Sequence, residues 1–117
     1  MVRLSATGSL CGCRVGGRYP RIGMFVVSLA VDLHLPAARS LKEKRMVVKS
    51  ILDGARHRFR VAAAEVGFQD QWQRAELGFA VVAGSHRHAT EVLDEVDRFV
   101  WSRPEIEVLS TERRWLE

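Results

Sequence analysis

The sequence lacks an apolar run long enough to cross a membrane, and it has only two cysteines. Its longest apolar runs, MFVVSLAV and LGFAVVAG, have the length of a β-strand, so we expect a soluble, cytoplasmic protein. It also lacks the Gly-x-Ser-x-Gly motif, a phosphate-binding glycine loop and the Rossmann fingerprint. We therefore expect no enzymatic activity, no catalytic residue and no cofactor.

The scarcity of cysteine also argues against a metal site. Cys11 and Cys13 are separated by one residue, a spacing that seldom closes a disulfide, and a metal would need two further ligands from elsewhere. His86 and His88 are two residues apart and do not share a helix face. We expect incidental reduced thiols and no bound metal.

Length and composition favour one domain. A chain of 117 residues with 47% hydrophobic residues can bury a core without disulfides or metal. Residues 1–22 show no sustained periodicity and are rich in Gly, Ser and Arg. We expect residues 1–23 to be a disordered N-terminal extension and residues 24–117 to form a single domain.

The positive charge of the chain is unevenly distributed. The formal net charge of +4 equals the charge of four arginines in residues 1–22, and residues 23–117 hold 14 basic and 14 acidic groups. Within the latter segment, residues 40–60 carry a net +5 and residues 61–117 a net −5. Any electrostatic role in the folded part must therefore come from this local asymmetry.

Hydrophobic periodicity predicts four strands and two helices. Alternating residues predict strands at 24–34, 60–67, 76–85 and 105–116. Ser40 and Glu43 form a capping box at the start of a helix that runs to about Phe59. Ser85 is the predicted N-cap of a second helix, which ends before Pro104. This order predicts an α+β, ferredoxin-like βαββαβ sandwich, a four-stranded antiparallel sheet with both helices on one face.

Spacing also predicts which faces are buried. The apolar face of the first helix comprises Leu41, Val48, Ile51, Leu52, Ala55 and Phe59, and that of the second Ala89, Val92, Val96, Phe99 and Val100. Small residues point to the other face of the sheet: Val26, Ser28, Ala30, Gly78, Ala80 and Val82. Such a surface suits contact with another sheet or helix, so a homodimer or a protein partner is one hypothesis.

One edge of the first helix is basic. At 100° per residue, a stripe within about 60° contains Lys42, Arg45, Lys49, Arg56 and Arg60. It could follow the phosphates of an RNA backbone, or it could be a solvated helix side with intramolecular ion pairs. Trp72 in QDQWQRA, with Arg74 beside it, could stack on a base, or the indole could cap the core.

Three segments carry a family resemblance: RSLKEKRMVVKSI, VAAAEVGFQDQWQRAELGFAVVAGS and HATEVLDEVDRFV. They resemble the YlxP-like family, a bacterial group of unknown function. The resemblance implies a ferredoxin-like domain that starts near Met24, with genes of transcription elongation, translation initiation and ribosome maturation often nearby. It implies no established catalytic activity. The positions that match are Ser40, Leu41, Lys42, Lys44, Arg45, Glu65, Gln69, Asp70, Trp72, Gln73 and Arg74.

The leading hypothesis is a non-enzymatic accessory protein that binds structured RNA or a ribosomal subunit through the basic stripe, with Trp72 and Arg74 as further contacts. The competing hypothesis is a protein-interaction or homodimerisation module that uses the small-residue sheet face. Neither hypothesis involves a membrane.

Overall fold

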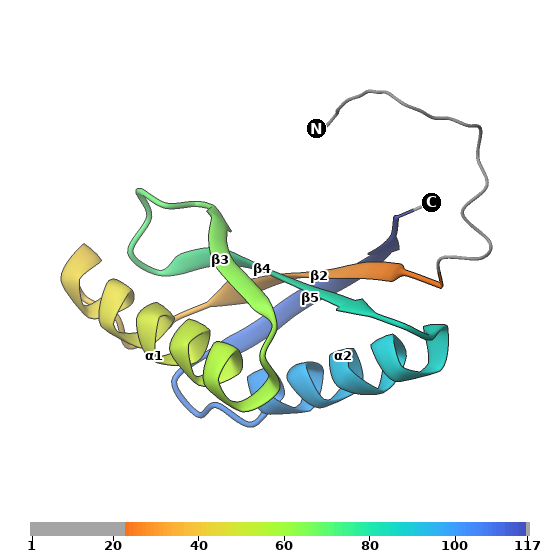
Figure 1. The fold of residues 1–117 in the computed structure, drawn as a ribbon. Coiled ribbons are helices and arrows are strands. Elements are labelled where there is room, and N and C mark those ends of the chain that lie inside the picture. Colours follow the sequence, from red (N-terminus) through yellow and green to blue (C-terminus); the bar gives the residue numbers. More distant parts are fainter. Residues whose placement is uncertain (1–22, 117) are drawn as a thin grey trace.

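The computed structural model describes residues 23–116 (Figure 1). The predicted N-terminal extension, apart from Gly23, and both cysteines lie outside the described residues. Within residues 23–116, neither helix is long and apolar enough to cross a membrane.

Within this part of the chain, four strands and two helices follow one another in the predicted order. They are β2 (Phe25–His34), α1 (Leu41–Phe59), β3 (Ala62–Gly67), β4 (Arg74–Ala83), α2 (His86–Trp101) and β5 (Glu107–Trp115). The strands form one sheet in the order β3-β4-β2-β5, and every neighbouring pair is antiparallel. Both helices cover the same face of the sheet (Figure 1). The ferredoxin-like fold is confirmed.

The central strands β2 and β4 supply much of the core because apolar residues alternate along both. The side chains buried beneath the helices are Val27, Leu29, Val31, Leu33, Ala75, Leu77, Phe79, Val81 and Ala83. Phe25 belongs to the same alternation but is exposed, because it lies at the end of β2, where its ring meets the His86 ring edge-on. The intervening residues of both strands point to the opposite, open face.

Capping residues set the start of each helix as predicted. The Ser40 hydroxyl accepts a hydrogen bond from the Glu43 amide at 3.1 Å, and the Ser85 hydroxyl accepts one from the His88 amide at 3.1 Å. The Glu43 carboxylate accepts from the Arg39 amide at 2.8 Å, one residue before the cap, where a standard capping box would use the Ser40 amide. Helix α1 ends at Phe59, and the left-handed backbone of its C-cap residue Arg60 (φ 56°) stops the helix.

The predicted helix faces need two corrections. On α2, Leu93 is fully buried although it was not assigned to the apolar face, whereas Val92 and Phe99 lie at its half-buried margin. On α1, Lys44 is buried, and Leu41 and Phe59 are only partly so. The α2 face is centred on residues spaced by four, three and four, namely Ala89, Leu93, Val96 and Val100.

Candidate nucleic-acid interface

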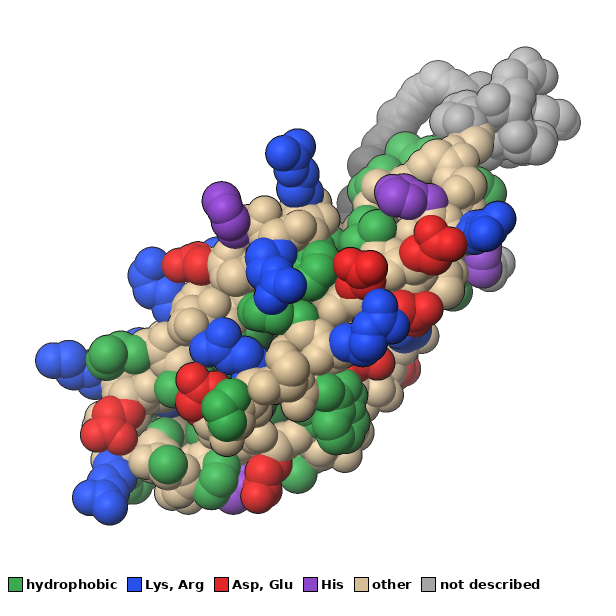
Figure 2. Space-filling view, turned by 90° about the horizontal axis from the view of Figure 1, so that it is seen from below, with side chains coloured by type: hydrophobic (Ala, Val, Ile, Leu, Met, Phe, Trp, Pro, Cys, Tyr) green, Lys and Arg blue, Asp and Glu red, His purple; other side chains and the backbone are tan. Residues whose placement is uncertain are grey.

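The predicted basic stripe is divided by an acidic residue. Asp53 accepts hydrogen bonds from Lys49 Nζ at 2.9 Å and from an Arg56 guanidinium nitrogen at 3.0 Å. The hydrogen bond from Lys49 is the main cause that lowers the pKa of Asp53. The intramolecular pairing that the sequence suggested for Lys49 is thus present. Figure 2, a view of the helix side, shows Lys and Arg side chains projecting separately, with acidic and apolar side chains between them.

Arg56 also contacts the edge of the sheet. Its guanidinium donates to the carbonyl of Ala63 in β3. The carbonyl of Glu65, two residues further along β3, accepts a hydrogen bond from the Gln69 side-chain amide at 3.0 Å. On an edge strand, every second residue turns its carbonyl away from the sheet. These two carbonyls are therefore occupied by side chains and do not accept hydrogen bonds from another strand, which makes edge pairing of β3 less favourable.

Lys42 and Arg45 differ from these residues. Both lie in the first turns of α1 and are exposed, and among residues 23–116 neither forms an ion pair. Their charge therefore remains available to an external partner. The nearby Lys49 forms an ion pair with Asp53, but its side chain is well exposed.

Lys44, in contrast, is a cation with no exposed surface. Its side chain is 0% exposed, and Nζ lies 2.7 Å from Glu65 Oε2 and donates to the Phe68 carbonyl at 2.6 Å. Phe68 has a positive φ of 57°, which is uncommon for a residue other than glycine. The buried ammonium thus connects α1 to the turn with a positive φ at Phe68, in the hairpin between β3 and β4.

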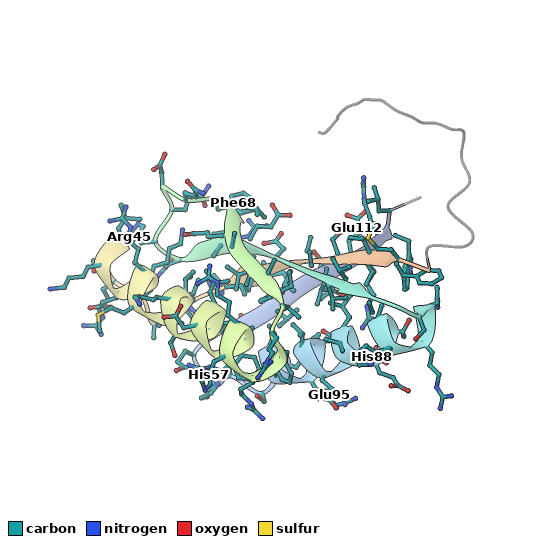
Figure 3. All side chains as sticks on the ribbon, viewed as in Figure 1. Arg45, His57, Phe68, His88, Glu95 and Glu112 are labelled. Carbon is teal, nitrogen blue, oxygen red and sulfur yellow. The ribbon has the colours of Figure 1, made fainter. Side chains whose placement is uncertain are left out.

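Further hydrogen bonds hold the tip of this hairpin against the start of α1. The Gln73 side chain donates to the Ala38 carbonyl at 3.2 Å, and the Gln73 carbonyl accepts from the Leu35 amide at 2.9 Å. Arg45 and Phe68 accordingly lie at the same end of the molecule (Figure 3). Trp72, next to Gln73, is 48% exposed and is not among the side chains packed on the core, so it does not cap the core.

Arg74 is engaged within the protein. Its guanidinium makes two hydrogen bonds to the Asp32 carboxylate, at 2.9 and 2.8 Å, and stacks over the Phe68 ring at 4.6 Å. The hydrogen bond to Asp32 is the main cause that raises the pKa of Arg74. This bidentate pair joins the two central strands beside the hairpin, which gives Arg74 a structural role. Its predicted contact with nucleic acid stays a prediction.

Arg60 lies at the other end of α1, beside an open groove of about 350 Å³ between the two helices. Two cations line this groove, Arg58 and Arg60, and so do two acids, Glu91 and Glu95. Because both signs meet there, the groove does not extend a continuous basic surface. Within residues 23–116, no three His, Cys, Asp or Glu side chains come together in a way that could hold a metal ion.

The structure thus gathers four of the seven predicted contact residues at one end, and three of these four are not held in an ion pair within residues 23–116. We call Lys42, Arg45 and Trp72, with the β3–β4 hairpin that presents the indole, the hairpin end. The sequence identifies Lys44 and Glu65 only as positions of the family resemblance and does not predict the buried ion pair by which they build this end. A signal was available, since Lys44 precedes Val48 by four and Ile51 by seven residues, the spacing of one buried helix face.

Comparison with known proteins agrees with the resemblance seen in the sequence. The family described as "Protein of unknown function (DUF503)" matches residues 26–113. The chain is 44% identical over 78 residues to the uncharacterized protein YlxP of Bacillus subtilis (strain 168), which covers 67% of this chain and 85% of that protein. The matched region spans the whole sheet and both helices except the ends of β2 and β5.

Proposed function

The chain belongs to the DUF503 family, and we propose that it is a non-enzymatic accessory protein that binds structured RNA, including the RNA of a ribosomal particle, through the hairpin end. In this proposal Lys42 and Arg45 contact phosphates, and Trp72 stacks on an unpaired base. Lys49 and Arg60 add weaker, peripheral attraction along α1. The gene neighbours that the YlxP-like resemblance implies also favour an RNA partner.

The observation that carries the proposal is the attachment of the hairpin to α1. Lys44 and Gln73 fix the tip against the start of the helix, so Trp72 lies at the same end of the molecule as two exposed cations without an ion pair among the described residues. An aromatic ring at the same end as unpaired cations suits single-stranded or bulged RNA, because the ring can stack on a base while the cations neutralise nearby phosphates. Prior ordering of the loop also lowers the entropy lost on binding.

The expected loss of RNA affinity on mutation follows from counterion release. Each phosphate contact changes the slope of log K against log salt by about 0.9 or less, which at about 0.1 M salt is roughly an eightfold effect on affinity. Loss of two contacts should therefore weaken binding by about 50-fold. Stacking on Trp72 should contribute at least about fivefold without changing the slope.

The experiment is a salt titration of binding to purified small ribosomal subunits and to their naked RNA. We expect Lys42→Glu with Arg45→Glu to weaken binding by about 50-fold or more and to reduce the slope by about 2. Trp72→Ala should weaken binding at an unchanged slope. The matched control is Arg87→Glu with Arg98→Glu, the same charge change on exposed positions of α2.

Two results would refute the proposal. The first is a wild-type chain that binds neither the particle nor its RNA at low salt. The second is an affinity that falls equally in the α1 double variant and in the α2 control, because that would show only a response to net charge.

A further inference from the structure

The open face of the sheet, opposite the helices, has an uncharged centre. On β2 and β4 its residues are Val26, Ser28, Ala30, Gly78, Ala80 and Val82. Val82 is 63% exposed, a large apolar side chain on a face that no described part of the chain covers. Contiguous apolar surface of this kind marks interaction sites more often than a scattered apolar residue does.

Strand β3 extends this face and makes its surface uneven. Ala62 lies opposite Ala80, and Ala64 opposite Gly78, so the middle of the face is lined by the smallest side chains. Val66, 55% exposed, reaches over Gly78, since a Cβ atom on Gly78 would lie 3.1 Å from Val66 Cγ1. The result is a shallow trough of Ala, Gly and Ser residues, bordered at one end by the Val26–Val82 pair and at the other by Val66.

Four charged residues at the border of the trough form two ion pairs, whereas Glu76, opposite Asp32, has no ion pair among residues 23–116. Asp32 and Arg74 are joined at 2.8 Å, and Glu112 and Arg114 on β5 at 3.0 Å. In Figure 3, Glu112 lies on the side of the sheet away from His88 and Glu95, which are on α2. The border therefore brings one unpaired carboxylate, Glu76, from each copy to an identical surface. The trough itself offers no cation or aromatic ring, so it does not suit nucleic acid.

We propose that two copies of this chain pair through the open faces of their sheets, with the Val26–Val82 ridge of each copy in the small-residue trough of the other. A two-fold axis between ridge and trough makes each such contact twice, as an isologous dimer requires. Aligned packing of two sheets is a common arrangement for faces of this kind.

The area of the face sets the expected affinity of the dimer. Four strands about 4.8 Å apart, over four rows of outward residues about 6.8 Å apart, cover on the order of 400 Å² of flat sheet. Because the accessible area of a corrugated face is larger, two copies would bury on the order of 1,000 Å², the lower limit for a specific interface. We therefore expect a reversible dimer with a dissociation constant in the micromolar range.

The test is sedimentation velocity of the full chain from about 5 to 200 μM, a range that brackets this dissociation constant. The wild-type chain should shift from monomer to dimer with concentration. Val82→Lys changes a side chain that is already exposed, so the fold should be kept while dimerisation weakens at least tenfold. Ala80→Arg, which fills the trough, should remain monomeric, and its thermal unfolding checks that it is folded. The matched control is Ala37→Arg, an exposed position before α1, which should dimerise like the wild type.

A wild-type chain that stays monomeric throughout this range would overturn the proposal and leave the face to a different partner. A dimer that persists in both Val82→Lys and folded Ala80→Arg would also overturn it. Lys42→Glu with Arg45→Glu should not change the dimer, so failure of the RNA proposal and failure of this one are distinguishable.

Discussion

Replacing Lys44 with methionine should destabilise the protein strongly, although the substitution removes a charge from the core. The ammonium is fully buried and lies 2.7 Å from Glu65 Oε2, a buried oxygen that accepts no other hydrogen bond. Methionine keeps most of the side-chain volume but leaves the Glu65 carboxylate without its partner. Breaking a buried ion pair in this way costs about 3–5 kcal/mol.

The lower end of that range is expected here. The Glu65 side chain retains 18% exposure, so its carboxylate recovers part of its hydration when Lys44 is lost. The Phe68 carbonyl still accepts from the Gln71 amide at 3.1 Å. We expect a loss of about 3 kcal/mol, which for a domain of this size lowers the melting temperature by roughly 12–24 °C.

The assay is urea unfolding followed by circular dichroism, with a double-mutant cycle. Lys44→Met with Glu65→Leu removes both charges and should recover most of the stability, because a buried pair replaced by apolar residues is often neutral. Lys49→Met is the control, since its ion pair is exposed and should change stability by less than about 0.5 kcal/mol. A single-variant loss below about 1 kcal/mol, or a double variant as unstable as the single one, would refute the reasoning.

Three other substitutions test contacts in the fold. Gly54→Ala should destabilise by about 1 kcal/mol in urea unfolding despite the higher helix propensity of alanine, because its Cβ atom would lie 2.8 Å from Phe99 Cζ; a stabilised variant contradicts this. Arg56→Ala should lose about 1 kcal/mol and exposes the Ala63 carbonyl, whereas Arg45→Ala should change stability by less than about 0.5 kcal/mol. Arg74→Lys should lose about 1 kcal/mol because lysine cannot form the bidentate pair with Asp32, and equal stability would show that this geometry is unimportant.

Local patterns in the sequence were sufficient for the fold but not for the site. Alternation placed β2 and β4, and the hydroxyls of Ser40 and Ser85 marked both helix starts, because these signals depend on neighbouring residues. The partners of Lys44, Arg56 and Arg74 come from other elements, at separations that no periodicity encodes. A helical wheel therefore grouped five cations whose surroundings differ, and it left Lys44 out of the apolar face although its spacing matches that face.

The hairpin end adjoins one end of the open sheet face, beyond the Asp32–Arg74 pair, and this arrangement predicts how dimerisation and RNA binding interact. A dimer formed through the sheet faces carries two hairpin ends, so one dimer could engage two sites on a long RNA. Joining two binding events in this way can raise affinity by 10²–10⁴-fold where both sites can be reached, without any new contact. We therefore expect Val82→Lys to weaken binding to full-length small-subunit RNA by at least about tenfold and to leave affinity for a short, single-site RNA unchanged. An equal loss on both RNAs would show instead that the sheet face itself contacts RNA, and an equal affinity of wild type and variant for the long RNA would show that only one hairpin end binds at a time.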